Sequence, residues 1–224
     1  DAVSRQMTNT LLRSARSIVV NTARDFSCSI ADASGRLICL AVGLPIHVAS
    51  SGLVAKTVPE LFEDIRPGDC FLNNSPYYGN THPADHTMCV PVFYEGEHLF
   101  TTMARAHQAD CGNAQPTTAL PFAEDLYQEG ALDFPWVRVQ RDYRDVRDVV
   151  RMARMRIRVP DQWYGDFLAA VGACRIGERE IAELCQKYGA ETIKACLSEW
   201  QDYGRRRMVE AIRQLPRGSW RNEN

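Results

Sequence analysis

The spacing of apolar and polar residues predicts a β-hairpin near the middle of the chain. Residues 87–93 and 99–106 are two apolar, strand-like runs, and Tyr94-Glu95-Gly96-Glu97 between them is typical of a tight turn. The two runs are therefore expected to pair as neighbouring antiparallel strands.

The turn also sets the register of this hairpin. If the loop has two residues, Tyr94 pairs with Glu97. The same register carried to the open end places Ala84 opposite His107, with Asp85 one step away. Polar residues with ligand chemistry thus gather where the hairpin opens.

Other segments follow helical or strand-like patterns. Apolar residues at helical spacing predict a helix over residues 4–18. Ser50 or Ser51 can cap a helix that runs to about residue 65. Asp25 lies at the open end of a second predicted hairpin. The remaining expected elements are the strands of that hairpin at 26–31 and 36–41, a strand at 70–72 leading into a polar loop at 73–85, an irregular segment at 108–134, and helices at 143–157, 161–188 and 190–215.

These elements indicate an α+β fold, with antiparallel β-hairpins and sheet in the N-terminal two-thirds and a helical C-terminal third. We expect an α+β region over residues 1–135, which holds the candidate metal ligands described below, and a helical region over residues 136–224. The chain begins at Asp1 and stops in residues 220–224 without a closing element. We therefore expect it to be a fragment of a longer subunit.

Composition excludes some classes of function. Hydrophobic residues make up 45% and charged residues 24% of the chain, as in ordinary globular proteins. A net charge of −2 gives no global attraction to nucleic acid or to an anionic membrane. No apolar run approaches the roughly 18 residues of a membrane span, and no signal-peptide pattern is present. We expect neither nucleic acid nor membrane as a partner.

The eight cysteines do not form a disulfide pattern. There is no Cys-x-x-Cys pair, and the chain is larger than a small disulfide-stapled domain. The cysteines are expected to be small, buried apolar residues in a reducing compartment. This predicts a cytoplasmic protein.

His82, Asp85 and His107 are the strongest candidates for chemistry. The predicted hairpin brings all three to one end, and two imidazoles with a carboxylate form a chelating set for a divalent metal ion. The alternative is that the short His-x-x-Asp pattern arose by chance, with His82 capping a turn and His107 lying at a strand edge.

Residues 138–158 contain eight arginines and three aspartates. Several arginines recur at every third residue, which predicts that they line one side of a helix. Only Tyr143 is available to stack on a base, so nucleic-acid binding is disfavoured. A solvated face or a face that contacts another subunit is favoured.

Common catalytic motifs are missing from the sequence. It has no phosphate-binding Gly-x-x-x-x-Gly-Lys-Ser/Thr loop, no Gly-x-Gly-x-x-Gly and no Gly-x-Ser-x-Gly. Ser50-Ser51-Gly52 near His47 allows a serine-hydrolase hypothesis, but its surroundings are more typical of a helix start. The catalytic residues stay unassigned.

A series of short motifs extends over nearly the whole chain. They are Arg24-Asp25-Phe26-Ser27-Cys28, Pro45-Ile46-His47-Val48, Pro67-Gly68-Asp69, Asn80-Thr81-His82-Pro83-Ala84-Asp85, Arg105-Ala106-His107-Gln108-Ala109-Asp110, Tyr127-Gln128-Glu129-Gly130, Pro160, Gly165-Asp166 and Gly177-Glu178-Arg179. As an ordered set they resemble the hydantoinase B/5-oxoprolinase family, which includes related subunits of acetone and acetophenone carboxylases.

The resemblance implies a metal-bearing catalytic subunit of an ATP-dependent enzyme. In such a subunit His82, Asp85 and His107 would be metal ligands and Asp25 a fourth. This donor set suits Zn²⁺ or Mn²⁺. ATP and Mg²⁺ would be bound by a separate hydantoinase A-like subunit, so the resemblance also implies a hetero-oligomer.

The substrate is a small molecule whose class stays open. The hydantoinase branch implies a cyclic amide that is opened by hydrolysis. This chain departs from that branch at Asn80, Pro83 and Ala84, and Gln108 after His107 is similar to the ketone carboxylases. The alternatives are therefore a ketone carboxylase subunit or, in a different class, a non-catalytic scaffold with a structural metal.

Overall fold

A computed structural model describes residues 1–41, 43–219 and 221 of the chain. Trp220 and residues 222–224, which belong to the end expected to lack a closing element, lie outside the described residues. The chain divides into two compact units, Asp1–Glu183 and Leu184–Asn224. The first unit contains all the candidate ligands.

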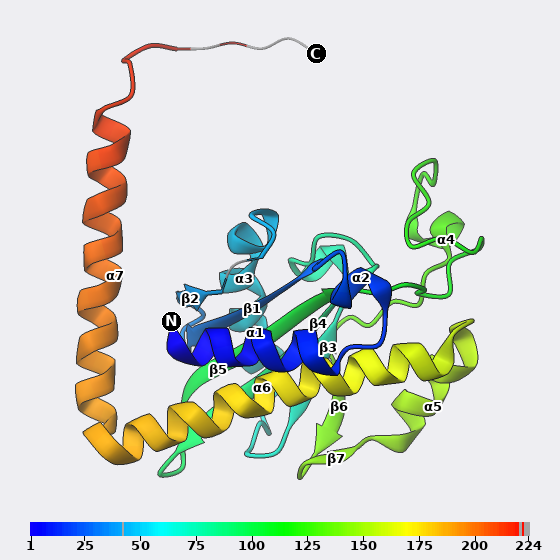
Figure 1. The fold of residues 1–224 in the computed structure, drawn as a ribbon, viewed down its shortest axis with the longest axis horizontal. Helices are drawn as coiled ribbons and strands as arrows, with labels where there is room; N and C mark the ends of the chain where they lie inside the picture. The colour runs from blue at the N-terminus through cyan, green and yellow to red at the C-terminus, as the bar shows by residue number, and fades with distance from the viewer. Residues whose placement is uncertain (42, 220, 222–224) are drawn as a thin grey trace. The chain divides into compact units, whose positions relative to one another are not determined.

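A seven-stranded antiparallel sheet forms the centre of the first unit (Figure 1). The strand order is β2-β1-β5-β4-β3-β6-β7. This confirms the expected α+β class and both hairpins. The strands are β1 (Phe26–Asp32), β2 (Leu37–Leu40), β3 (Cys70–Asn73), β4 (Asp85–Tyr94), β5 (Glu97–His107), β6 (Val137–Arg141) and β7 (Arg144–Asp145).

The five longer helices in the described part of the chain fall at or near the expected positions, whereas three short ones, at residues 18–21, 76–78 and 126–129, were not predicted. Seven are α-helices and one is a 3₁₀ turn. They are α1 (Ala2–Ser14), α2 (Ile18–Asn21), α3 (Ile46–Leu61), η1 (Pro76–Tyr78), α4 (Leu126–Glu129), α5 (Arg147–Arg156), α6 (Pro160–Tyr188) and α7 (Ala190–Arg213). No helix in the described part of the chain has the length and apolar character needed to cross a membrane.

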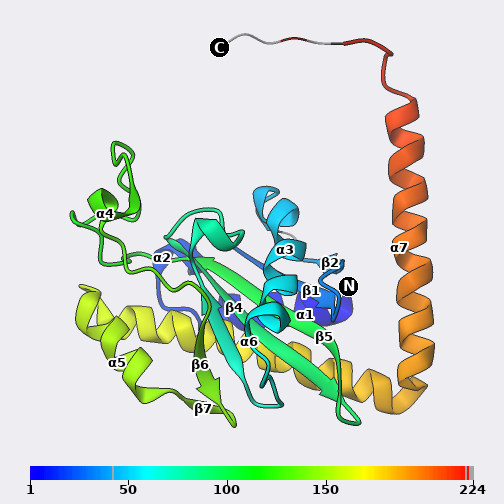
Figure 2. The same cartoon turned by 180° about the vertical axis from the view of Figure 1, so that it is seen from behind.

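Helices cover both faces of the sheet (Figures 1 and 2). Helix α3 buries Val54 and Val58 against Phe71 and Met103 of the sheet. Helices α1 and α6 cover the other face, where a Cβ atom on Gly177 would lie 2.7 Å from side chains of both α1 and β5. Only glycine permits this approach. Successive side chains of β4 and β5 point to opposite faces of the sheet, so one set packs against α3 and the other packs against α6.

The N-terminal helix ends earlier than the prediction of 4–18. Helix α1 stops at Ser14, and α2 begins at Ile18. The side chain of Asp166 in α6 accepts hydrogen bonds from the backbone N–H groups of Arg16 and Ser17, at 2.6 and 3.1 Å. A distant residue therefore interrupts a helix that the local pattern favours.

The predicted start of the next helix is wrong. Helix α3 begins at Ile46, so Ser50 and Ser51 lie inside it rather than at its cap. The Ser51 hydroxyl donates to the His47 carbonyl oxygen at 2.6 Å, one turn back. The helix ends at Leu61 instead of about residue 65, shortly after a proline inside its last turn.

The arginine-rich segment is not a single helix. Arg138 and Arg141 lie on strand β6 and pair with Asp64 and Asp69. Strands β6 and β7 therefore precede α5, which begins at Arg147 rather than 143. Val139 is buried at the centre of β6, whereas the arginine spacing alone indicates a helix. The division at residue 135 stays a prediction.

Candidate metal centre

Three candidate residues form a row across neighbouring strands. Asp25 immediately precedes β1, His107 ends β5, and Asp85 begins β4. The backbone N–H of His107 donates to the Asp25 carbonyl oxygen at 3.0 Å, and Asp85 pairs with His107 across the β4–β5 ladder. Because the strand order is β1-β5-β4, Asp25 lies on one side of His107 and Asp85 lies on the other.

This pairing differs by one residue from the predicted register. Tyr94 pairs with Glu97 as expected, but the ladder shifts between Val92 and Phe93, so Val92 pairs with Phe100. The extra residue on β5 is Leu99, which makes this a β-bulge. Because of the bulge, Asp85 rather than Ala84 lies opposite His107. Pattern and turn type alone do not reveal such an insertion.

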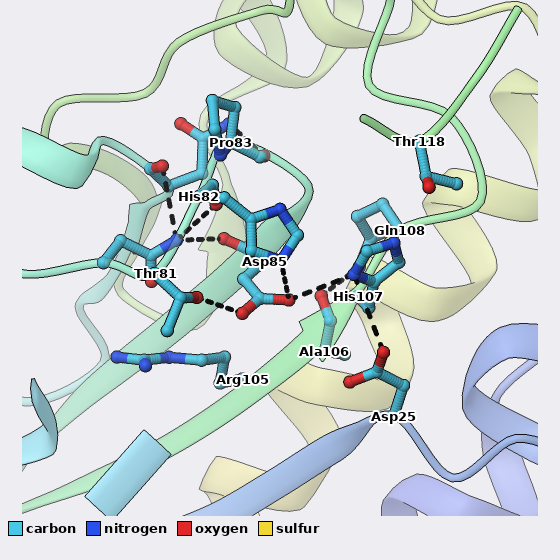
Figure 3. A network of polar contacts seen from close by, with 12 residues as sticks. Asp25, Thr81, His82, Pro83, Asp85, Arg105, Ala106, His107, Gln108 and Thr118 are labelled. Carbon is cyan, nitrogen blue, oxygen red and sulfur yellow. Dashed lines mark hydrogen bonds and ion pairs between the residues drawn. The ribbon is translucent and has the colours of Figure 1, made fainter. Parts of the chain in front are cut away.

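The side chains of the row meet that of His82 from the preceding loop (Figure 3). Asp85 Oδ1 lies 3.4 Å from His82 Nε2 and 3.4 Å from His107 Nδ1. His107 Nδ1 also lies 3.7 Å from Asp25 Oδ2. Ligand atoms of His82, Asp85 and His107 all lie within 4.8 Å of one another, which is a spacing that one metal ion can bridge. The predicted residues are therefore together.

His47 is a site residue that the sequence interpretation missed. It lies in the first turn of α3, is 1% exposed, and places Nε2 3.2 Å from Asp85 Oδ2. Its Nδ1 lies 2.8 Å from the Ser27 hydroxyl. Atoms of Asp25, His47 and Asp85 form a second group within 4.8 Å of one another. The motif Pro45-Ile46-His47-Val48 was the available signal, but the predicted helix start left this histidine outside α3.

Asp85 is the electrostatic centre of this cluster. It is 2% exposed, and burial by itself would raise the pKa of its carboxyl group. Hydrogen bonds from His107, His47, His82 and Thr81 outweigh burial and hold the pKa of Asp85 well below its usual range. The hydrogen bond to Asp85 is in turn the main cause that raises the pKa of His82. The carboxylate is therefore ionised at neutral pH.

The donor set fits a divalent cation. Asp25 Oδ1 and Asp85 Oδ1 are buried, and among the described residues neither accepts a short, well-directed hydrogen bond, since the imidazoles that face Asp85 Oδ1 lie 3.4 Å away. The contacts between these carboxylates and imidazoles are longer than charge-assisted hydrogen bonds of about 2.7–2.9 Å. Oxygen and imidazole nitrogen donors that lie close together without bonding tightly to each other suit Zn²⁺ or Mn²⁺.

Exposure differs across the site. His82 and Asp25 are 38% and 29% exposed, whereas Asp85 and His47 are nearly inaccessible. One side of the donor set therefore faces solvent, and the other side is closed by α3. An open side is what a small-molecule substrate needs to reach a metal.

The serine-hydrolase hypothesis finds no support in this geometry. The Ser51 hydroxyl donates to a carbonyl within its own helix, and the Ser50 hydroxyl accepts from Arg105 at 2.7 Å. The ring of His47 instead contacts Ser27 and Asp85. Ser27 is itself buried and is 3% exposed. No described serine is both accessible and paired with this histidine.

Comparison with known proteins identifies one matching family model and several similar proteins. The whole chain, residues 1–224, matches the family model described as hydantoinase B/oxoprolinase. The beta subunit of the caprolactamase of Pseudomonas jessenii is 35% identical over 97% of this chain. The B subunit of a putative D-/L-hydantoinase of Pseudomonas sp. (strain NS671) is 31% identical over 99% of it.

A third relative and one crystal structure extend the comparison. The delta subunit of the acetophenone carboxylase of Aromatoleum aromaticum is 27% identical over 96% of the chain and 33% of the relative. The crystal structure of the ATP-dependent caprolactamase from Pseudomonas jessenii superposes with a TM-score of 0.90 at 34% identity, over 97% of this chain. The chain spans only 38% of that structure's chain and 38% of each of the two Pseudomonas relatives.

Proposed function

Because the chain belongs to the hydantoinase B/oxoprolinase family, we propose that it is the metal-bearing part of a catalytic subunit of an ATP-dependent enzyme that opens cyclic amides. The observation that carries this proposal is the cluster of His82, Asp85 and His107 at the ends of β4 and β5, with Asp25 Oδ2 3.7 Å from His107 Nδ1. The names of two relatives, a caprolactamase and a hydantoinase, support a cyclic amide as substrate.

The four converging residues are the proposed ligands of one Zn²⁺ or Mn²⁺ ion. Such an ion would act as a Lewis acid and would make water a better nucleophile near neutral pH. His47 is assigned a different role, because its two ring nitrogens already contact Ser27 and Asp85. It orients the carboxylate of Asp85, as partners of metal ligands commonly do.

The difference in burial across the site sets the side from which a substrate can approach. Asp85 and His47 are buried and exclude water from the closed side. A cyclic amide would approach from the side of His82 and Asp25, where the ligands retain exposure. This open side favours a catalytic site over a structural metal site with four protein ligands and no accessible position.

ATP is proposed to bind to a separate, hydantoinase A-like subunit. The chain has no phosphate-binding loop, and one matching structure is titled an ATP-dependent caprolactamase. A basic cleft of about 1010 Å³ offers a docking surface within the first compact unit. Its lining includes Tyr143, Arg144, Arg147, Arg151, Arg154 and Met155. Arginine, tyrosine and methionine are the residue types enriched at protein interfaces.

Ketone carboxylation is the second candidate, and the carboxylase relative supports it. The carboxylase-like Gln108 does not decide the question, because its side chain turns back and donates to the Ala106 carbonyl oxygen at 3.0 Å.

A cytoplasmic location also stays a prediction from cysteine usage.

The proposed function is tested by combining the full-length subunit with its ATP-binding partner. ε-Caprolactam, hydantoin and 5-oxoproline are offered with ATP, with and without bicarbonate. Ring opening without bicarbonate supports the proposal, and product formation from acetone or acetophenone that requires bicarbonate supports the carboxylase. Activity that survives complete removal of metal would contradict both.

A further inference from the structure

A chain of buried polar side chains runs beneath the loop that carries His82 and Asp85. Arg105 Nε on β5 donates to Thr87 Oγ1 on β4 at 2.8 Å, and Thr87 Oγ1 donates to Asn80 Oδ1 at 2.8 Å. Figure 3 shows Arg105 reaching under this loop from the strand that ends in His107. These three side chains connect two strands to the loop.

The direction of the hydrogen bonds in this chain is fixed by chemistry. Arginine can only donate, so the Thr87 hydroxyl accepts from Arg105, and carbonyl oxygens can only accept, so the Asn80 atom that faces them is the donor Nδ2. Asn80 therefore presents its oxygen to Thr87 and its Nδ2 to the loop. That nitrogen lies 2.6 Å from the Asp85 carbonyl oxygen and 2.9 Å from that of His82. One amide thus holds the backbone of two proposed ligands.

Burial makes this arrangement stiff. Arg105, Thr87 and Asn80 are 3%, 1% and 7% exposed. Arg105 has no carboxylate within 4.0 Å in the part of the chain that the structure describes, and its second anchor is the Ser50 hydroxyl of α3 at 2.7 Å. A buried guanidinium is costly unless its donors are satisfied, so these hydroxyls hold it in one geometry.

We propose that Asn80 is a positioning residue that fixes His82 and Asp85 relative to each other, with its own orientation set by Arg105 through Thr87. It acts on the proposed ligands through their two carbonyl groups, and the same Nδ2 also lies 3.2 Å from the Asn74 carbonyl oxygen. The inference rests on the ligand roles proposed above. Loss of the amide would leave the backbone of the loop free to move, so the cation would have to order it on binding.

The test compares variants of the full-length subunit in three measurements. These are the dissociation constant for Zn²⁺ by chelator competition, hydrogen–deuterium exchange of residues 80–87 in metal-free protein, and the unfolding temperature of that metal-free protein. Asn80→Ala is expected to bind Zn²⁺ about 10- to 100-fold more weakly, as for other residues that support metal ligands. Exchange in the loop should rise, while the unfolding temperature changes little.

Two further substitutions separate orientation from bulk. Asn80→Asp keeps the size and the acceptor for Thr87 but turns an oxygen towards the two carbonyls, so it should weaken Zn²⁺ at least as much as Asn80→Ala. Thr87→Val removes one link and should have an intermediate effect. Thr101→Val is the matched control, because that hydroxyl is also buried on the sheet but contacts His98 instead. It should bind Zn²⁺ like the parent.

Three results would overturn the inference. One is hydrogen–deuterium exchange of residues 80–87 in Asn80→Ala that equals the exchange in the parent. This result would overturn the inference even if the parent binds no metal. Another is parental Zn²⁺ affinity in Asn80→Asp. The third is an equal loss of affinity in Thr101→Val, which would show a general effect of destabilisation. If the parent bound neither Zn²⁺ nor Mn²⁺ while loop exchange still rose in Asn80→Ala, the ligand roles would fail and the positioning of the loop would stand.

Discussion

Truncation of His107 to alanine is expected to remove most of the metal affinity and to leave the fold intact. His107 is the last residue of β5 and is 15% exposed. Its Nδ1 lies 3.4 Å from Asp85 Oδ1 and 3.7 Å from Asp25 Oδ2, and neither distance is that of a strong hydrogen bond. Loss of such contacts at a strand end should cost about 0–1 kcal/mol in the metal-free protein.

The effect on metal binding is much larger. Four-ligand zinc sites bind with about 10–16 kcal/mol at neutral pH, so an equal share per ligand is about 2.5–4 kcal/mol. That share corresponds to roughly 10²- to 10³-fold weaker binding. At a metal concentration about 1,000 times the parental dissociation constant, the metal would stabilise the parent by about 4.1 kcal/mol and the variant by about 0.4–1.4 kcal/mol.

Thermal unfolding with and without Zn²⁺ measures this difference. The rise in unfolding temperature on adding metal should be about a tenth to a third as large in His107→Ala as in the parent. His98→Ala is the control, since His98 is the other histidine of β5 and contacts Phe93 and Thr101. It should keep the full rise. A full rise in His107→Ala would refute the ligand assignment.

The subunit without its partner is expected to bind no ATP in isothermal titration, because its sequence has no phosphate-binding loop; micromolar binding in the absence of the partner would contradict the proposed division of labour. ATP turnover by the combined subunits is expected to be independent of bicarbonate, and a strict requirement would assign the carboxylase chemistry instead. Burial raises the pKa of the Cys28 and Cys70 thiols from 9.0 to about 12. The unfolded chain therefore loses these protons first, and the stability present below pH 9 should decline towards pH 12. Cys28→Ala should show a shallower alkaline decline in thermal unfolding, and an unchanged slope would argue against this linkage.

The site was predictable where local patterns define it. Turn chemistry located the hairpin end, and this was enough to bring His82, Asp85 and His107 together. The bulge at Leu99 was not predictable. One extra residue leaves the residues on both sides of it with a strand-like pattern, so the sequence does not show where the register shifts. His47 was missed for a related reason, since its place depends on how α3 packs over the sheet and not on its own neighbours.

The fold shows the same limit. The α+β class followed from hairpins and helical periodicity. The break between α1 and α2 did not, because Asp166 causes it from a distant part of the chain. Strand β6 was hidden because its arginines suggested a helix, whereas the burial of Val139 and the ion pairs of Arg138 with Asp64 and Asp69 determine the structure. Tertiary contacts outweigh local preference at each of these points.

Anomalous diffraction from crystals of the full-length protein, purified without chelator, would locate the proposed metal ion directly. Data collected at the Zn and Mn absorption edges identify the element and its position together. We expect a single strong peak about 2.0–2.3 Å from donor atoms of Asp25, His82, Asp85 and His107. Fully active protein with no peak at this position, or with its metal bound elsewhere in the chain, would contradict the proposed metal site.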